Sequence, residues 1–316
     1  MGEFELISHY FKHAACAQAG GALTLGIGDD CALLNLAVGE QLAVSSDSLV
    51  EGVHFPKDCD PALLAMRGLA CAVSDLAAMG AEPMAFTLAL TLPKADERWL
   101  AAFAQGLEAM AAQCGIALAG GDTTRGPLNL NFTVFGHVPF TQALRRSGAA
   151  VGDVVCVGGS LGDGAGALAF VLGEREANAN SAYLLERYWQ PAPQLALGKV
   201  LRGLAHAAMD ISDGLVADAA HIASASGVQL VLERAKLPLS KALVSEYGQA
   251  AAQAFALTGG DDYRLLFTLP RESYLSLIAQ GFAVTAIGTV APGAGVVVLD
   301  EHAEPLNMAA AGFTHF

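Results

Sequence analysis

Carboxylates in five short segments are the side chains of this chain best suited to chemistry. Most of these segments follow an apolar stretch closely, and they cover residues 26–30, 45–47, 120–124, 210–214 and 259–262. Side chains at the ends of strands are where α/β proteins build their sites. Mg²⁺ prefers hard oxygen ligands and takes one or two carboxylates together with waters and phosphate oxygens. The five segments therefore indicate several Mg²⁺ ions around a polyphosphate.

Each segment taken alone also fits a structural role. Aspartate before glycine is a common turn signal, and aspartate or serine is a common helix N-cap. Asp213 followed by Gly214 is the clearest case, because a helix is expected to begin at Leu215. Both interpretations stay open for any single segment, and the metal hypothesis depends on all of them together.

Asp75 is harder to explain as a structural residue. On its predicted helix it lies one turn from Cys71 and Met79, within a small apolar surface. A carboxylate on such a surface is costly unless it is paired or bound to a metal. A metal ligand is the favoured interpretation, and a salt bridge to Arg67 or Arg125 is the structural alternative.

A glycine-rich run at residues 157–164 lies between a predicted strand and a predicted helix. Such a run can present amide N–H groups to an anion. It is not a Walker A loop, and the Gly198-Lys199 pair is followed by Val200 in the wrong context for one. The motif set of protein kinases is also absent. The run alone is a weak indication of phosphate binding.

Ser160 gives the same run a second interpretation, because it stands in a G-x-S-x-G pattern typical of a nucleophile elbow. Asp210 or Asp213, followed by His221 or His302, would complete a triad in the required chain order. No HGGG-like oxyanion segment accompanies it, and the N-terminal carboxylates would be left without a purpose. A serine hydrolase is therefore the alternative from another enzyme class.

The charge balance argues against a nucleic-acid partner. The chain has 17 Lys and Arg residues against 31 Asp and Glu residues, a formal net charge of −14. Non-specific nucleic-acid binding depends on Lys and Arg neutralising phosphates. An acidic protein that binds phosphates must obtain positive charge from elsewhere, and bound Mg²⁺ is the obvious source.

Length and hydropathy indicate a globular protein of two domains. The chain has 316 residues, of which 53% are hydrophobic and 15% charged, enough for a large core. The N-terminus lacks the basic start and apolar run of a signal peptide. Charges interrupt the long apolar stretches, so no segment is expected to span a bilayer. With six cysteines and no CxxC pair, we expect a cytoplasmic protein with reduced thiols.

Short apolar strands alternate with amphipathic helices along the chain. Predicted strands cover residues 41–46, 84–92, 128–134, 154–157, 207–209, 228–232, 265–269 and 283–290. Predicted helices cover residues 61–80, about 100–115 and 271–280, and others begin near residues 164 and 215. A turn-rich stretch at 139–152 separates an N-terminal domain (1–140) from a C-terminal domain (150–316). The fold class is α/β (α+β), with two mixed domains.

The motifs extend over nearly the whole chain in a fixed order. They are GIGDD at 26–30, DSLVEGVHF at 47–55, SDLAAMGA at 74–81, GGDTTRG at 120–126, RSG at 146–148, AMDISDGL at 208–215, GGDDY at 259–263 and GFTHF at 312–316. Together they resemble the thiamine-monophosphate kinase family, in the superfamily of aminoimidazole ribonucleotide synthetase and selenophosphate synthetase.

The resemblance implies a role for each group of motif residues. The implied Mg²⁺ ligands are Asp30, Ser45, Ser46, Asp47, Asp75, Asp122, Asp210 and Asp213. The implied ATP contacts are Gly121, Asp122, Arg146 and Ser212, and thiamine monophosphate would contact His54, Asp261 and Phe313. The family usually has glutamate at the position of Asp261, often glutamate at that of Arg264, and frequently tryptophan at that of Phe313.

The resemblance also implies the activity and the assembly. ATP would phosphorylate thiamine monophosphate to thiamine diphosphate by direct in-line transfer, with Mg²⁺ and without a general base. A homodimer would form through the N-terminal sheets, and the C-terminal domain would be ferredoxin-like. His54 and Arg146 each also fit a structural role. A superfamily enzyme with another acceptor and a non-enzymatic nucleotide- or metal-binding regulator remain alternatives.

Overall fold

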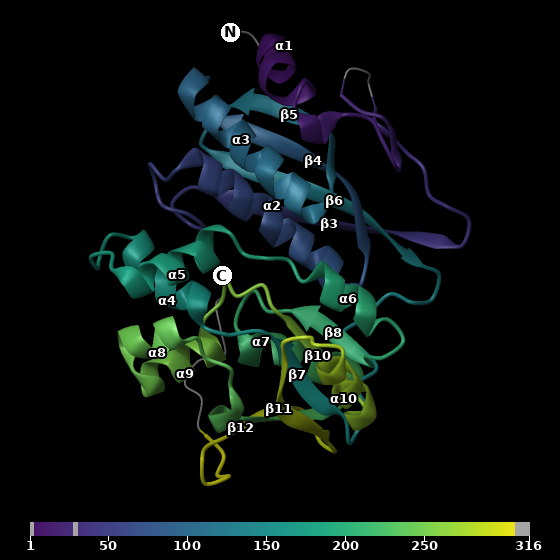
Figure 1. Ribbon diagram of the computed structural model, residues 1–316, viewed down its shortest axis with the longest axis vertical. Helices are drawn as coiled ribbons and strands as arrows, with labels where there is room; N and C mark the ends of the chain where they lie inside the picture. Colours follow the sequence, from purple (N-terminus) through teal and green to yellow (C-terminus); the bar gives the residue numbers. More distant parts are fainter. Residues whose placement is uncertain (1–2, 28–30, 307–316) are drawn as a thin grey trace. The chain divides into compact units, whose positions relative to one another are not determined.

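The computed structural model describes residues 3–27 and 31–306, and the chain divides into two compact units (Figure 1). Unit 1 comprises Met1–Leu76 and Ala81–Thr141, and unit 2 comprises Ala77–Gly80 and Gln142–Phe316. Each unit combines helices with a mixed sheet. The predicted class of two mixed α/β domains is confirmed.

Unit 1 has a four-stranded sheet with the strand order β3-β6-β4-β5. Its elements are α1 (Glu3–Leu6), η1 (Ile7–Lys12), η2 (Ala15–Ala17), β1 (Leu23–Leu25), β2 (Leu33–Leu34), β3 (Glu40–Val50), α2 (Pro61–Ala78), β4 (Glu82–Leu92), α3 (Glu97–Cys114), β5 (Ala117–Arg125) and β6 (Asn129–Pro139). The last two residues of α2 belong to unit 2. Strands β4 and β5 are parallel and are joined through α3, and β6 pairs antiparallel with β3 and β4.

Helices α2 and α3 begin and end where the sequence predicts, to within a few residues. The Asp60 carboxylate accepts the amides of Ala62 (2.8 Å) and Leu63 (3.2 Å), which makes it the N-cap ahead of Pro61. Helix α3 begins after Asp96, whose carboxylate accepts two backbone amides, and ends at Gly115. Both helices lie side by side along the sheet (Figure 1), and the ring of Phe132 from β6 packs against Gly68 of α2.

Two of the aspartate segments lie within strands and not in the turns that the sequence predicts. Strand β3 does not end at Ser46, because it continues to Val50 and pairs residue by residue with β6. Residues 120–124 belong to β5, an edge strand that pairs with β4 alone in its sheet. Serine, aspartate and glycine are rare in strands, so their composition predicts turns, but the long-range pairing decides the structure.

Unit 2 has a six-stranded sheet with the strand order β12-β9-β11-β7-β10-β8. Its elements are β7 (Val154–Gly158), α4 (Asp163–Val171), α5 (Ala179–Trp189), α6 (Leu195–Leu201), β8 (Ala207–Asp210), α7 (Leu215–Ser226), β9 (Gln229–Glu233), η3 (Arg234–Lys236), α8 (Lys241–Tyr247), α9 (Gln249–Thr258), β10 (Leu265–Leu269), α10 (Arg271–Ala279), β11 (Val284–Ala291) and β12 (Gly295–Leu299). Neighbouring strands are antiparallel, except for the parallel pair β9–β12.

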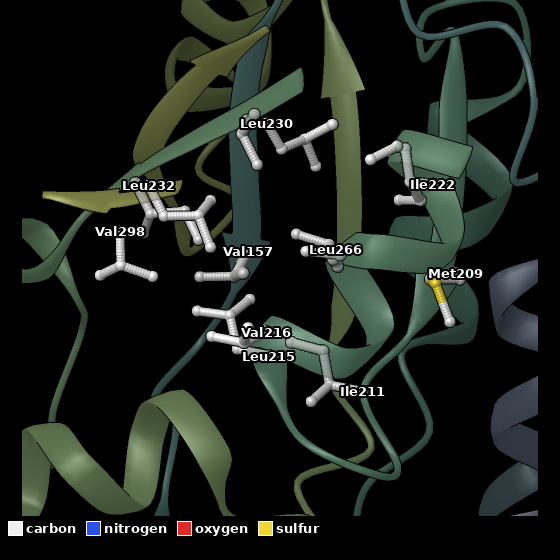
Figure 2. Close-up of a cluster of buried hydrophobic side chains, with 14 of the residues drawn as sticks. Val157, Met209, Ile211, Leu215, Val216, Ile222, Leu230, Leu232, Leu266 and Val298 are labelled. Carbon is white, nitrogen blue, oxygen red and sulfur yellow. The ribbon is translucent and has the colours of Figure 1, made fainter. Parts of the chain in front are cut away.

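Helices and loops cover both faces of the unit 2 sheet, so its central strands are buried on both sides. On one face Val157 of β7 and Leu266 of β10 pack with Leu215 and Ile222 of α7 (Figure 2). On the other face Cys156 and Phe267 belong to a second cluster with residues of α6 and α10. This rigid sheet supports the loops at the ends of β7, β8 and β10.

Helix α2 corrects one expectation from the sequence. Its 18 residues are long and apolar enough to cross a membrane, although no such segment is expected. However, 78% of that window is buried inside the protein. Helix α2 is therefore a core helix, and its length and composition reflect burial against the sheet.

Candidate functional site

The candidate site in unit 1 is built where β3 faces α2. Side chains alternate along a strand, so Ser45 and Asp47 share one face of β3, opposite Val134 and Phe132 of β6. The Ser45 hydroxyl donates a hydrogen bond to the Asp75 carboxylate on α2. The predicted residues Ser45, Asp47 and Asp75 therefore come together, although they are up to 30 residues apart in sequence.

The two carboxylates of this group repel each other. Burial, with the nearby negative charge of Asp75 as the second cause, raises the pKa of Asp47 to about 6. A half-buried pair of like charges is unfavourable unless a proton or a cation compensates it. With the Ser45 hydroxyl beside it, the pair presents hard oxygen atoms, the donor set that Mg²⁺ prefers.

Ser46 points away from this group. Its neighbours along β3 point to the opposite face, and its hydroxyl lies 3.0 Å from that of Thr133 on β6. It also lies within 3.4 Å of the Asn131 side chain. The Ser46 side chain thus lies on the opposite face of β3 from Ser45 and Asp47, with hydroxyl contacts inside the sheet, and its ligand role stays a prediction.

A cavity of about 730 Å³ lies beside the edge strand of unit 1. Its walls include Phe11, Lys12, Leu88, Gly120, Gly121 and Asp122. A side chain at position 121 would place its Cβ 1.9 Å from the Leu88 carbonyl oxygen, so glycine is required there. The cavity joins apolar walls to a cation and exposed backbone, a combination that suits a nucleotide. Sequence reasoning missed Lys12, which no motif marks.

His54 has a partner inside its own turn. The backbone amide of Val50 donates to His54 Nδ1 at 3.0 Å. The neutral ring therefore carries its proton on Nε2. This bond fixes the ring orientation at the end of β3, which supports the structural interpretation of His54 and leaves a donor of known position on the ring.

In unit 2, the loop after β8 is held by an aspartate that sequence reasoning missed. The Asp218 carboxylate on α7 accepts the backbone amides of Ser212, Asp213 and Gly214, each at 3.1 Å. Asp218 is 1% exposed. Burial is the main reason that its pKa is raised to about 6, and these three hydrogen bonds oppose the shift. An acidic residue in the first helical turn was the available signal, because it favours the amides at a helix N-terminus.

Two predicted loops of unit 2 are joined by backbone hydrogen bonds. The Asp261 amide donates to the Ser212 carbonyl at 2.9 Å, and the Tyr263 amide donates to the Ile211 carbonyl at 2.8 Å. These bonds extend the antiparallel pairing of β8 with β10. Ser212, a predicted ATP contact, is therefore adjacent to Asp261, a predicted substrate contact, while Asp210 ends β8 and is 7% exposed.

The remaining predicted residues are more dispersed. Arg146 is exposed, and its carbonyl accepts a hydrogen bond from the Ser226 hydroxyl at 3.1 Å. Asp30 and Phe313 lie outside the described residues. Asp122 belongs to unit 1, whereas Asp210 and Asp213 belong to unit 2. Over residues 3–27 and 31–306, no three or more His, Cys, Asp or Glu side chains group closely enough to hold a metal ion.

Ser160 is not arranged as a nucleophile. Its hydroxyl donates to the Asp163 carboxylate at 2.5 Å, and that carboxylate also accepts the Ser240 hydroxyl. His221 and His302 are exposed. Because a serine nucleophile needs a basic partner that accepts its proton, the Ser160 geometry does not support the hydrolase alternative.

The two units correspond to two known domain families. Residues 28–138 match the family described as AIR synthase related protein, N-terminal domain, and residues 150–301 match its C-terminal domain family. Fold and site thus define an AIR synthase-related protein.

Full-length relatives narrow the assignment. Thiamine-monophosphate kinase of Escherichia coli (strain K12) is 42% identical over 321 residues, covering 100% of this chain and 98% of the relative. A crystal structure of thiamine-monophosphate kinase from Stenotrophomonas maltophilia K279a is 45% identical with a TM-score of 0.83, covering 88% of this chain and 91% of that one. A structure described as AaThiL complexed with AMPPCP and TMP is 32% identical with a TM-score of 0.81, covering 92% of both chains. The chain belongs to the thiamine-monophosphate kinase family.

The carboxylate pair predicts that Asp47→Asn stabilises the metal-free protein. Removing the half-buried charge relieves burial and repulsion, and we expect the free energy of unfolding at neutral pH to rise by about 1–3 kcal/mol. Urea denaturation with EDTA measures this change. Glu97→Gln, which neutralises an exposed carboxylate of the same unit, should leave the midpoint nearly unchanged. A lower midpoint for Asp47→Asn would contradict the proposed repulsion.

The carboxylate pair also predicts that the free energy of unfolding depends on pH. The pKa of Asp47 is raised from 3.8 to about 6, so between these values the folded protein binds more protons at this group than the unfolded chain. The stability contributed by protonated Asp47 is fully present below the unfolded pKa of 3.8. It is lost as the pH rises through the folded pKa of about 6. The stability gain of Asp47→Asn over wild type should therefore grow between about pH 4 and pH 7. Parallel stability curves across this range would show that Asp47 has an ordinary pKa.

Proposed function

We propose that the chain transfers the γ-phosphoryl group of ATP directly to the phosphate of thiamine monophosphate, giving thiamine diphosphate. The activity is that of the family to which the chain belongs. The structural observation that favours it is the group of Ser45, Asp47 and Asp75, where two repelling carboxylates meet at a strand–helix contact. A relative bound to AMPPCP and TMP supports the same pair of substrates.

The unit 1 carboxylates fit a divalent cation. Asp47 and Asp75 would hold Mg²⁺, and the Ser45 oxygen lies beside them. Asp30 and Asp122 of unit 1, and Asp210 and Asp213 of unit 2, would hold further ions. Mg²⁺ supplies the positive charge that neutralises two polyanionic substrates. The net charge of −14 makes this contribution essential, because the chain itself brings few cations.

The chemistry of the acceptor phosphate supports a reaction that needs no general base. The second pKa of a phosphate monoester is about 6, so at neutral pH it is largely dianionic and already a nucleophile. The remaining requirement is positioning of acceptor and γ-phosphate in line. The described residues place carboxylates, amides and hydroxyls at the candidate positions, which suits positioning and charge neutralisation more than proton abstraction.

The nucleotide would occupy the cavity of unit 1. Gly121 presents backbone, Lys12 offers a cation for a phosphate, and the apolar walls suit a base. Ser212 and Arg146 of unit 2 would be further phosphate contacts. A guanidinium binds phosphate oxygens well, and Arg146 is exposed, so its side chain is available to do so.

Thiamine monophosphate would contact His54, Asp261 and Phe313. The Val50 amide leaves His54 with an Nε2–H donor. The Asp261 carboxylate accepts the Tyr263 hydroxyl at 3.2 Å. The Asp261 backbone amide donates to the carbonyl of Ser212, a proposed ATP contact. Phe313 would supply an aromatic surface for the thiamine rings.

The protein would act as a cytoplasmic homodimer joined through the unit 1 sheets. Leu42 and Val44 are 46% and 55% exposed on β3, and the next residues on that face, Ser46 and Ser48, are exposed too. An uncovered sheet face with large apolar side chains is typical of an interface. The unit 2 sheet, with helices on a largely antiparallel core, would be a variant of the ferredoxin-like arrangement.

An assay of ADP release tests the activity. With ATP and Mg²⁺, release should depend on thiamine monophosphate and stop with EDTA. Chirally labelled γ-phosphate should emerge with inverted configuration, because a single in-line step inverts phosphorus. Retention would refute direct transfer. ADP release without dependence on thiamine monophosphate would indicate another acceptor, and ATP binding without turnover would indicate a regulatory protein.

The proposed dimer interface predicts that one charge introduced on the exposed face of β3 will dissociate the dimer. Val44→Asp should convert the dimer to a monomer, because the carboxylate would be buried without a partner at the interface. Light scattering after size exclusion gives the mass of each variant. Val53→Asp changes a valine that is 60% exposed outside the sheet face and should remain dimeric. A wild-type monomer, or a dimeric Val44→Asp, would overturn this interface.

A further inference from the structure

A buried carboxylate next to the proposed substrate contact has no role in the function as derived so far. Asp262 is 8% exposed. Its Oδ2 accepts the Gly162 amide at 2.7 Å, and its Oδ1 accepts the same amide at 3.0 Å and the Gly164 amide at 3.5 Å. Asp262 therefore binds the backbone of the glycine-rich run, 100 residues away in sequence.

The backbone on both sides of Asp262 is strained. Asp261 has φ +67° and Tyr263 has φ +48°, a left-handed conformation that costs other residues than glycine about 1 kcal/mol or more each. Their amides donate to the Ser212 and Ile211 carbonyls. The left-handed residues on both sides of Asp262 thus direct their own amides to the loop after β8. The Asp262 carboxylate between them is directed to the glycine-rich run. Such strain persists where the surroundings hold it in place.

The three loops touch directly at this point. A side chain at position 164 would place its Cβ 2.3 Å from the Asp261 carbonyl oxygen, so the glycine-rich run lies against the Asp261 backbone. On its other side, the Asp261 amide donates a hydrogen bond to the Ser212 carbonyl. The glycine-rich run, Asp261 and Ser212 are therefore linked by an unbroken series of contacts.

Hydrogen bonds from two amides to one carboxylate are strong enough to set this geometry. Bonds to an ionised acceptor are about twice as strong as neutral ones. Burial raises the pKa of Asp262 to about 8, while the Gly162 amide favours the ionised form and lowers it. Both oxygens accept the Gly162 amide, so the ionised form, which is populated above about pH 8, makes these hydrogen bonds best.

We infer that Asp262 is a positioning residue for the kinase reaction: by holding the Gly162 and Gly164 amides it fixes Asp261 and Ser212 where the two substrates meet them. This inference rests on the proposed function. It assigns the glycine-rich run a role in supporting the substrate loops, whereas the sequence suggested direct phosphate binding.

The first test separates positioning from stability. Asp262→Asn keeps the size of the side chain but replaces one acceptor oxygen with an NH₂ group. At about pH 9, where the wild-type carboxyl is ionised, the KM for thiamine monophosphate should rise about tenfold, equivalent to about 1.4 kcal/mol, with a much smaller change in kcat. Asp153→Asn is the control, since Asp153 is 4% exposed and accepts the Ala150 amide within the same unit. It should lower stability without raising KM.

The second test does not depend on activity. Hydrogen–deuterium exchange of peptides covering residues 159–164 and 210–214 should be about tenfold faster in Asp262→Asn than in wild type, and unchanged there in Asp153→Asn. Unchanged exchange and KM in Asp262→Asn would overturn the inference, as would equal KM changes in both variants. If exchange responds but wild type shows no thiamine-monophosphate-dependent ADP release, the proposed function fails while the loop coupling stands.

Discussion

Repulsion between carboxylates that the fold holds close together is the constraint on which the rest of the structure depends. Asp47 and Asp75 approach each other from a strand and a helix, in a chain that already carries an excess of negative charge. The fold cannot relax this contact, because β3 is fixed by its ladder to β6 and α2 is packed into the core. This arrangement is unfavourable, and in the proposed function a cation would compensate it. Stability and function therefore oppose each other at this point.

Unit 2 uses aspartates in a different way. Asp218 and Asp262 accept backbone amides from loops, and these amides favour the ionised carboxylate against the opposite effect of burial. The same side-chain type thus has two physical roles in one chain. Asp47 and Asp75 are the aspartates of the proposed metal site, whereas the buried Asp218 and Asp262 hold the backbone of loops.

Local patterns predicted much of the fold. Asp60 and Pro61 predicted where α2 begins, and Gly115 predicted where α3 ends, because helix caps and helix breakers act within a few residues. The strand through Asp47 was not predicted, since its serines and aspartate become strand residues only through pairing with β6. Ser45, Asp47 and Asp75, which the resemblance implies as Mg²⁺ ligands, lie close together, and their ligand role stays a prediction. Asp218 was missed although it stands in the first turn of α7, and Asp262 was noted only as part of the 259–262 segment, because the sequence does not show which backbone amides a carboxylate will bind.

The pairing of β3 with β6 determines both which side chains of β3 face α2 and which form the proposed dimer surface. Ser45 and Asp47 point to α2, while Leu42, Val44 and Ser46 point to the uncovered face. Loss or gain of one residue within Glu40–Val50 would exchange the two faces beyond that point. Acidic ligands would then turn outward and valine would turn toward the helix. Insertions and deletions should thus be far less tolerated in this strand than in the preceding loop at 35–39, and evolution can vary the strand only by substitution.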